Sequence, residues 1–311
     1  MPMLIVANRW SRVPRPCFPW VRTVERIICQ EPLEALGGPE IQVHSDYSGD
    51  HKGSEYRTIA LLYSDVVAST RWIYHRASWR RKHLPDGRRM SFKGLNDRKK
   101  QVALVPFLEA AHEISGLLLV VAINRSVTHP CQGELVRTAM ATRFMARFAW
   151  GAAQFERMVQ IAHLVALLGG GLGLHGQDLY WFSDEDELFA NERAASDLTQ
   201  VLGLFTGNYF QHRPGILGLG TTALDEGDRY EEDCAAVADL SAGAIARVLT
   251  CLRRDLGRLP ASMAYEHAIS CGMKTDVITD WFADESSRLR KVLVVFEPAN
   301  QKQHCVFKMT M

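Results

Sequence analysis

The pattern of apolar and polar positions predicts that a β-sheet begins near residue 40. Apolar and polar side chains alternate in "EIQVHSD" (residues 40–46), and "YRTIALLYSD" (residues 56–65) is rich in apolar residues. Both patterns are typical of strands. Ser48 and Gly49 lie between the two segments and suit a tight turn. These residues therefore predict an antiparallel hairpin, with Asp46 near the end of its first strand.

Helical spacing of apolar residues follows the hairpin. It predicts one helix over residues 66–84 and a second within "RKKQVALVPFLEAAHEI" (residues 98–114), where Pro106 indicates a late start or a bend. Between them, "RRMSFKGL" (residues 88–95) is a candidate short strand. The continuous apolar run "GLLLVVAIN" (residues 116–124) predicts a strand that is buried on both faces.

The second half of the chain predicts helices that alternate with short strands. A long helix is expected over residues 134–168, and "DLYWFSD" (residues 178–184) predicts a strand. The small residues of "CAAVADLSAGAIARVLTCLRR" (residues 234–254) predict a helix that packs closely against another element. "KVLVVFE" (residues 291–297) predicts a final strand, for which "HCVFKM" (residues 304–309) is a candidate partner. This order of elements predicts an α/β or α+β domain with a mixed sheet.

The composition is that of an ordinary globular protein. The chain has 311 residues, of which 47% are hydrophobic, so it can bury a substantial core. Its seven cysteines are scattered without a C-x-x-C pair, as expected for reduced packing residues. The apolar run at the N-terminus is too short for a secretory signal, and the longest apolar run (residues 161–174) is too short to span a membrane. We therefore expect a cytoplasmic protein with no membrane partner.

Three carboxylates stand at positions that suggest chemistry. Asp46 lies near a strand end, Asp184 follows another strand, and Asp239 interrupts a helix of small residues. Each has a structural alternative: Asp46 as a turn residue, Asp184 as a helix N-cap, and Asp239 as a buried acid satisfied by serine or backbone donors. Together they are candidate ligands for two Mg²⁺ or Mn²⁺ ions, which prefer oxygen ligands and stabilise the attacking and leaving oxygens of phosphodiester hydrolysis. Asp50 fits turn chemistry better than Asp46 does.

A basic segment extends from residue 71 to residue 100 and contains seven arginines and four lysines but only two acids. Such an excess favours contact with phosphate groups. Trp72 and Trp79 are seven residues apart on one helical face, so we expect both in the core. The preferred phosphate contacts surround the loop that follows the helix: Arg80, Arg81, Lys82, Arg88 and Arg89.

Four short segments, taken in order, resemble the DUF3800 family of prokaryotic proteins, which belongs to the ribonuclease H-like superfamily. They are "HSDYSGDHKGSEYRTIALLYSD", "SFKGLNDRKK", "DLYWFSDEDE" and "CAAVADLSAGAIARVL". The resemblance implies an α/β fold with a ribonuclease H-like mixed β-sheet flanked by helices. It places this domain at residues 40–311, with a helical insertion at about residues 132–170, after an N-terminal extension of residues 1–39.

The resemblance also implies roles for particular residues. It makes Asp46, Asp184 and Asp239 metal ligands and gives Lys93 a phosphate contact. The chain departs from the family pattern at Tyr47, where the family has a glutamate. Either the site is degenerate or another acid completes it, and the candidates are Asp50, Asp186 and Asp97.

These observations predict a metal-dependent phosphodiesterase, in particular a nuclease that hydrolyses DNA or RNA by a two-metal-ion mechanism. The alternative is a non-catalytic subunit with a degenerate ribonuclease H-like site, which binds nucleic acid or other proteins. Nucleic acid is the expected partner. Proteins of a defence or mobile-element system are further candidate partners.

Overall fold

Apolar strands assemble into one mixed sheet in the computed structural model of the chain, which describes residues 19–33, 36–127, 152–183, 192–225, 227–260, 270–299 and 304–311. Among these residues the sheet has seven strands in the order β5-β4-β1-β2-β3-β6-β7. The strands are β1 (Glu40–Ser48), β2 (Tyr56–Asp65), β3 (Gly116–Asn124), β4 (Asp178–Ser183), β5 (Leu217–Thr221), β6 (Leu289–Pro298) and β7 (His304–Met309).

The predicted hairpin and the mixed sheet are both confirmed. β1 and β2 are antiparallel, with Asp46 opposite Ala60. β4 lies on the other side of β1 and runs parallel to it, with Ser183 opposite Ser45, and β5 continues in the same direction. β3 is antiparallel to β2, β6 is parallel to β3, and β7 is antiparallel to β6. The carboxyl ends of β1 and β4 therefore lie side by side near the centre of the sheet.

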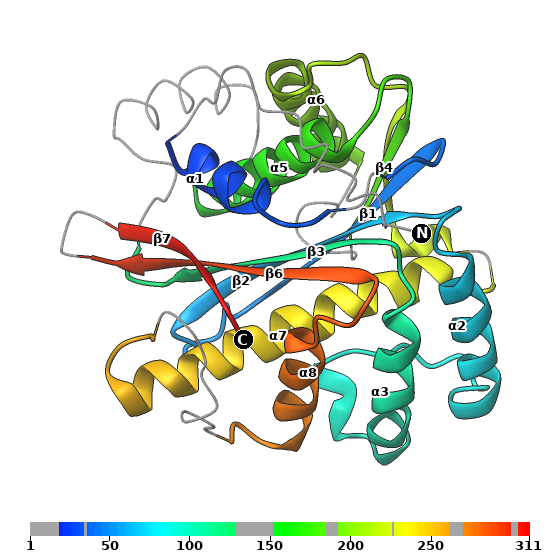
Figure 1. Ribbon diagram of the computed structural model, residues 1–311, viewed down its shortest axis with the longest axis vertical. Helices are drawn as coiled ribbons and strands as arrows, with labels where there is room; N and C mark the ends of the chain where they lie inside the picture. The colour runs from blue at the N-terminus through cyan, green and yellow to red at the C-terminus, as the bar shows by residue number, and fades with distance from the viewer. Residues whose placement is uncertain are drawn as a thin grey trace, which may run out of the picture.

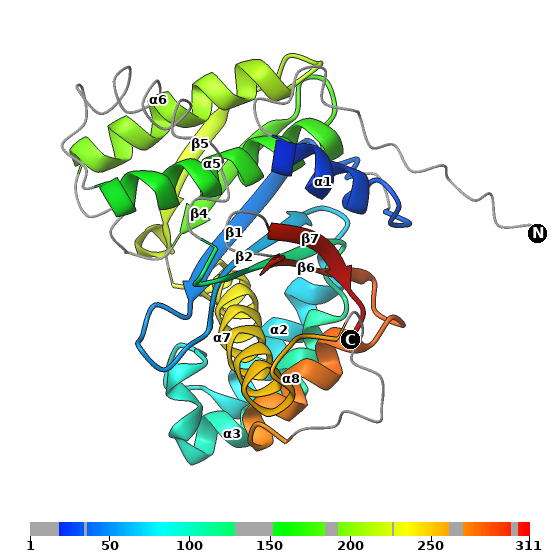
Figure 2. The same cartoon turned by 90° about the vertical axis from the view of Figure 1, so that its left-hand side faces the viewer.

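Helices cover both faces of the sheet (Figures 1 and 2). One face carries α1 (Pro19–Ile28), α5 (Ala152–Leu172) and α6 (Glu192–Tyr209), and the other carries α2 (Thr70–His83), α3 (Arg98–Ala111), α7 (Tyr230–Leu256) and α8 (Met273–Ala283). The described part of the predicted N-terminal extension belongs to this core, because α1 buries Trp20, Val21, Val24 and Ile28.

Strand alternation divides the core between the two faces. In β3, Leu117 and Leu119 pack with α5 and α6, whereas Leu118 and Val120 pack with α3 and α7. All four side chains are buried. The prediction that this run is buried on both faces is therefore confirmed.

α7 crosses the sheet and packs mainly on β1 and β2. Its small side chains allow a close approach, and Thr58 Oγ1 on β2 donates a hydrogen bond of 3.0 Å to the carbonyl oxygen of Ala242. By length and composition α7 could cross a membrane, but 83% of its most apolar window is buried inside the protein. This pattern is the one expected for the core helix of a soluble protein.

Two local predictions differ from the structure. Residues 88–95 form no strand, and Lys93–Asn96 is a short 3-10 helix, η1. α3 starts at Arg98 and runs through Pro106, because buried Phe107 and Leu108 fix the helix against the core.

β5 was missed because its sequence, "LGLGT", has two glycines. Gly218 lies opposite Tyr180 and Gly220 lies opposite Phe182. A Cβ at Gly218 would lie 2.3 Å from the ring of Tyr180, so glycine is the residue that lets this strand pair with β4. The predicted strand at residues 3–7 lies outside the described residues. So does the part of the helix predicted over residues 134–168 that precedes residue 152.

Candidate active site

An open pocket of about 440 Å³ lies where the β1–β2 turn meets the segment that precedes α3. It contains two of the three predicted carboxylates, Asp46 and Asp239, together with Lys93. The full lining consists of Asp46, Tyr47, Ser48, Gly49, Asp50, His51, Arg89, Ser91, Phe92, Lys93 and Asp239. We call this the carboxylate pocket. Residues from a strand, a loop and a late helix thus converge in this pocket.

Asp46 reaches the pocket from the strand face that α7 covers. Successive side chains of a strand point to opposite faces, so Asp46 shares its face with His44. His44 is buried, and its Nε2 lies 2.5 Å from Oε2 of Glu231 near the start of α7. Its ring also stacks on Phe182. Asp46 is half-buried, whereas the residues before it in β1, from Ile41 to Ser45, are buried. It therefore lies where β1 becomes accessible to solvent.

Asp239 comes from the middle of α7 and is also half-buried. Its Oδ2 accepts a hydrogen bond of 2.9 Å from the backbone N–H of Phe92. The small residues around Asp239 predicted a helix that packs closely against another element, and this is confirmed at Gly243, one turn later. Asp239 itself lines the pocket.

Phe92 is held on several sides. A Cβ at Gly243 would lie 2.4 Å from its ring, so the helix backbone touches the ring directly. Lys274 Nζ lies 4.5 Å from the ring centroid and donates a 3.1 Å hydrogen bond to the Phe92 carbonyl oxygen. Burial, followed by the charge of Arg247, lowers the pKa of Lys274, whereas Asp239 acts in the opposite direction. Phe92 therefore connects Asp239 to a cation on α8.

Lys274 was not identified from the sequence, although its position in the chain is unusual for a lysine. It lies in the first turn of α8, where the helix dipole disfavours a cation. A lysine at such a position needs compensating contacts elsewhere, and here the carbonyl and ring of Phe92 supply them.

Asp50, the predicted additional ligand, is committed to another partner. Its Oδ2 accepts a 2.7 Å hydrogen bond from Nη1 of Arg157 on α5. The guanidinium of Arg157 also lies 4.7 Å from the centroid of the Tyr47 ring. Tyr47 hydrogen-bonds Ser45 Oγ through its hydroxyl at 2.8 Å. These contacts favour a structural role for Asp50 over metal binding.

Asp97, a further candidate ligand, does not line the carboxylate pocket. Asp97 caps α3, with Oδ1 accepting from Lys99 N at 2.8 Å, and it pairs with Arg88. The hydrogen bond from Lys99 is the main cause that lowers the pKa of Asp97. Asp184 and Asp186 lie outside the described residues. Within the described ranges, no group of three or more His, Cys, Asp or Glu side chains is placed to hold a metal ion.

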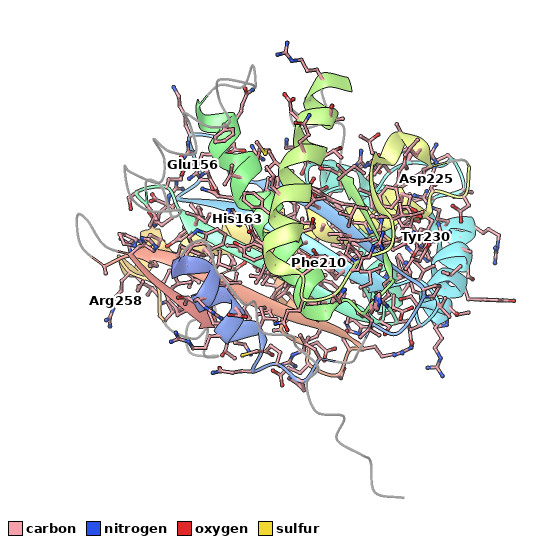
Figure 3. All side chains as sticks on the ribbon, turned by 90° about the horizontal axis from the view of Figure 1, so that it is seen from above. Glu156, His163, Phe210, Asp225, Tyr230 and Arg258 are labelled. Atoms are coloured by element: carbon pink, nitrogen blue, oxygen red, sulfur yellow. The ribbon has the colours of Figure 1, made fainter. Side chains whose placement is uncertain are left out.

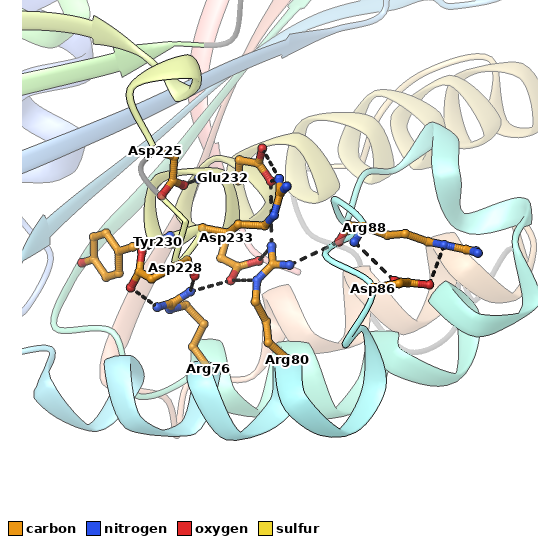
Figure 4. Close-up of polar contacts among 10 residues, drawn as sticks. Arg76, Arg80, Asp86, Arg88, Asp225, Asp228, Tyr230, Glu232 and Asp233 are labelled. Atoms are coloured by element: carbon orange, nitrogen blue, oxygen red, sulfur yellow. Dashed lines mark hydrogen bonds and ion pairs between the residues drawn. The ribbon is translucent and has the colours of Figure 1, made fainter.

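Arg80 is not placed to contact a phosphate. It is nearly buried, and it binds both carboxylate oxygens of Asp233, at 2.6 and 2.7 Å (Figure 4). Arg76 donates to the same Asp233, at 3.0 Å, and to Asp228 at 2.7 Å. These contacts lock α2 to the start of α7. We therefore remove Arg80 from the predicted set of phosphate contacts.

The remaining predicted cations have different surroundings. Arg88 is exposed but pairs with Asp86 and Asp97. Arg89 is half-buried and lines the carboxylate pocket with exposed Lys93. Arg81 and Lys82 are exposed on α2 and do not line that pocket. Trp72 and Trp79 are buried, as predicted.

Comparisons with protein-family models and with curated proteins gave no match for this chain. Its chemistry is therefore inferred from the residues of the pocket and of the basic segment.

Proposed function

We propose that the protein is a metal-dependent phosphodiesterase, specifically a nuclease that acts on DNA or RNA. The observation that carries this proposal is the convergence of Asp46 and Asp239 with Lys93 in one open pocket. Two carboxylates beside a cation form an arrangement suited to a phosphodiester, since the acids hold divalent ions and the lysine attracts the phosphate.

Asp46 and Asp239 are the residues that would hold Mg²⁺ or Mn²⁺. Their oxygen donors fit these hard ions, and both side chains are accessible from the pocket. We propose Asp184 as the third ligand, because it follows Ser183, the residue that pairs with Ser45 beside Asp46. The ions, when bound, neutralise charge on the attacking and leaving oxygens.

The chain's own residues position the carboxylates and the substrate. The Phe92 N–H orients Asp239 by its hydrogen bond, and Gly243 and Lys274 keep Phe92 in place. In this proposal, Lys93 contacts a non-bridging phosphate oxygen of the substrate. Asp50 keeps the β1–β2 turn attached to α5 through Arg157.

We further propose that the sheet that starts at residue 40, together with its covering helices, is a ribonuclease H-like domain of the DUF3800 type, in a prokaryotic and cytoplasmic protein. Two features support this assignment: the sheet begins with an antiparallel hairpin, and β4 and β5 run parallel to β1 on its other side. The two carboxylates come from the first strand of that sheet and from the late helix that covers it.

A second candidate function is a non-catalytic subunit that binds nucleic acid or partner proteins of a defence or mobile-element system. Tyr47 is the observation that favours it. A phenol stands where the family has an acid, and it is engaged with Ser45 and Arg157. If the site is degenerate, the basic segment would still bind phosphate groups.

Asp46→Asn and Asp239→Asn test the proposed nuclease, with Asp50→Asn as the matched control. Wild-type protein is incubated with single-stranded and duplex DNA and RNA in Mg²⁺ or Mn²⁺. We expect cleavage that EDTA stops, that Asp46→Asn and Asp239→Asn abolish, and that Asp50→Asn retains. Thermal melting in Mn²⁺ provides a second measurement, since an ion that binds the folded state raises its melting temperature.

Intact substrates in every mixture, together with a melting temperature that Mn²⁺ does not change, would refute the nuclease. Salt-dependent binding of nucleic acid under those same conditions would then support the non-catalytic subunit.

A further inference from the structure

The outer face of α2 is a stripe of exposed polar side chains that the carboxylate pocket does not include. We call it the α2 stripe, and it consists of Arg71, Tyr74, His75, Ser78, Arg81 and Lys82. These positions follow the helical spacing i, i+3, i+4, i+7, i+10 and i+11, so they share one face. The stripe is about 16 Å long at 1.5 Å per residue.

The inner face of the same helix is also basic, but its charges are neutralised. Arg76 and Arg80 are bound to Asp228 and Asp233. On the outer face, Arg71 has one long contact, 3.6 Å to Glu113. Among the described residues, Arg81 and Lys82 are in no ion pair. α2 contains no acid, so its outer face keeps a net positive charge.

Tyr74 distinguishes the stripe from an ordinary solvated helix. Its side chain is 77% exposed, whereas Trp72 and Trp79 of the same helix are buried. A tyrosine this exposed presents an apolar ring and a polar hydroxyl to a ligand. The ring lies within a cationic face, and an aromatic ring among cations is the combination that binds single-stranded nucleic acid by base stacking and phosphate contact.

We propose that the α2 stripe binds single-stranded nucleic acid, with Arg71, Arg81 and Lys82 on the phosphates and Tyr74 stacked on an unpaired base. The inference rests on the proposed function only in its choice of nucleic acid as the ligand. It deepens that function by specifying single-stranded over duplex nucleic acid.

Charge and connectivity both support this choice. A polyanion complements a face with three cations and no acid. In a duplex the faces of the bases are covered by their neighbours, so Tyr74 would add nothing there, whereas an unpaired base offers a free face. The loop that follows α2 leads directly to Arg89 and Lys93 in the carboxylate pocket.

The test is fluorescence anisotropy of labelled single-stranded and duplex oligonucleotides with the full chain in EDTA, over a series of salt concentrations. The variants are Tyr74→Ala and the double variant Arg81→Ala/Lys82→Ala. Arg258→Ala and Val102→Ala are matched controls: both residues are exposed, and Figure 3 shows Arg258 on the opposite side of the molecule from α2. All five substituted residues are on the surface, so the fold should survive in the four variants, and circular dichroism checks this.

We expect Tyr74→Ala to weaken single-strand binding by about tenfold and to leave duplex binding nearly unchanged. Each cation removed should reduce the slope of log affinity against log salt by about 0.7 on single strands. The two control variants should bind like the wild type.

Failure of the wild type to bind single strands, or unchanged binding by the double variant, would overturn the proposal. Equal losses on single strands and duplexes with Tyr74→Ala would overturn its strand selectivity. Because binding is measured without metal or cleavage, a protein that binds through the stripe but never cleaves would refute the nuclease and retain this inference. A protein that cleaves nucleic acid but binds it equally well without the stripe cations would support the nuclease and refute this inference.

Discussion

Asp50 and Arg157 form an ion pair at the edge of the carboxylate pocket, with Oδ2 and Nη1 2.7 Å apart. The pair joins the turn of the first hairpin to α5, across the sheet from α7, and the same guanidinium covers the ring of Tyr47. One of the acids that line the pocket is therefore neutralised by the protein itself. Asp46 and Asp239 line the same pocket.

Asp50→Asn should consequently have little effect on metal binding. The pair is well exposed, at 30% for Arg157 and 53% for Asp50, and exposed pairs contribute less than about 1 kcal/mol. We expect the free energy of unfolding to fall by no more than that, and any rise of the melting temperature in Mn²⁺ to persist. Loss of that rise in Asp50→Asn, to the extent seen in Asp46→Asn, would show that Asp50 is a ligand.

Asp233→Asn should destabilise the protein strongly. Asp233 is fully buried and accepts hydrogen bonds from both Arg76 and Arg80. Its neutralisation leaves two buried guanidinium groups short of a counter-charge, a change that costs about 3–5 kcal/mol. Urea denaturation measures this. The control is Asp86→Asn, whose exposed pair with Arg88 should be worth less than about 1 kcal/mol, and equal effects of the two variants would contradict the structure.

Gly243→Ala should disturb the carboxylate pocket through Phe92. The added Cβ would lie 2.4 Å from the Phe92 ring, and overpacking of this kind costs roughly 1–3 kcal/mol. Displacement of Phe92 also weakens the hydrogen bond from its N–H to Asp239. We expect a lower free energy of unfolding and faster hydrogen exchange at the Phe92 amide.

Gly203→Ala is the matched control, because a Cβ at that exposed position on α6 meets no atom within 4 Å. There the greater helix propensity of alanine should stabilise the protein by about 0.5–1 kcal/mol. Stabilisation by Gly243→Ala as well would contradict the close contact with Phe92.

His163 should make the protein less stable at acid pH. It is buried on α5 with Nδ1 2.6 Å from the Tyr209 hydroxyl, and burial lowers its pKa from 6.5 to about 3. Below pH 6.5 the unfolded chain binds a proton at this residue that the folded protein does not, so the free energy of unfolding falls as the pH falls toward 3. Between pH 7 and pH 5 this residue alone should account for about 2 kcal/mol.

His163→Gln removes the titrating group but keeps a hydrogen-bonding side chain. Denaturation at pH 7 and pH 5 should therefore show a smaller loss of stability in this variant than in the wild type. An equal loss in both proteins would mean that His163 is protonated in the folded state.

Local sequence patterns predicted much of the fold but not the ion pairs that decide which charged residues are available. The apolar run of β3 and the alternation in β1 identified both strands, because burial of one or two faces dictates those patterns. Arg80 and Asp50 have partners more than 100 residues away, Asp233 and Arg157, and no local pattern predicts such pairs. Asp46 was singled out by its place near a strand end, and Asp239 because it interrupts a helix of small residues. Lys274 stands out less, because a cation in the first turn of a helix is only mildly disfavoured by the helix dipole.

The apolar character of α7 has a consequence for the order in which the protein is made. Its principal partners, β1 and β2, precede it in the chain, so they have already left the ribosome when α7 emerges. β1 and β2 can thus cover the apolar face of α7 as soon as it emerges, before membrane-insertion machinery or a chaperone binds it. A fragment that contains α7 without that hairpin would lack this cover and should partition into detergent or lipid.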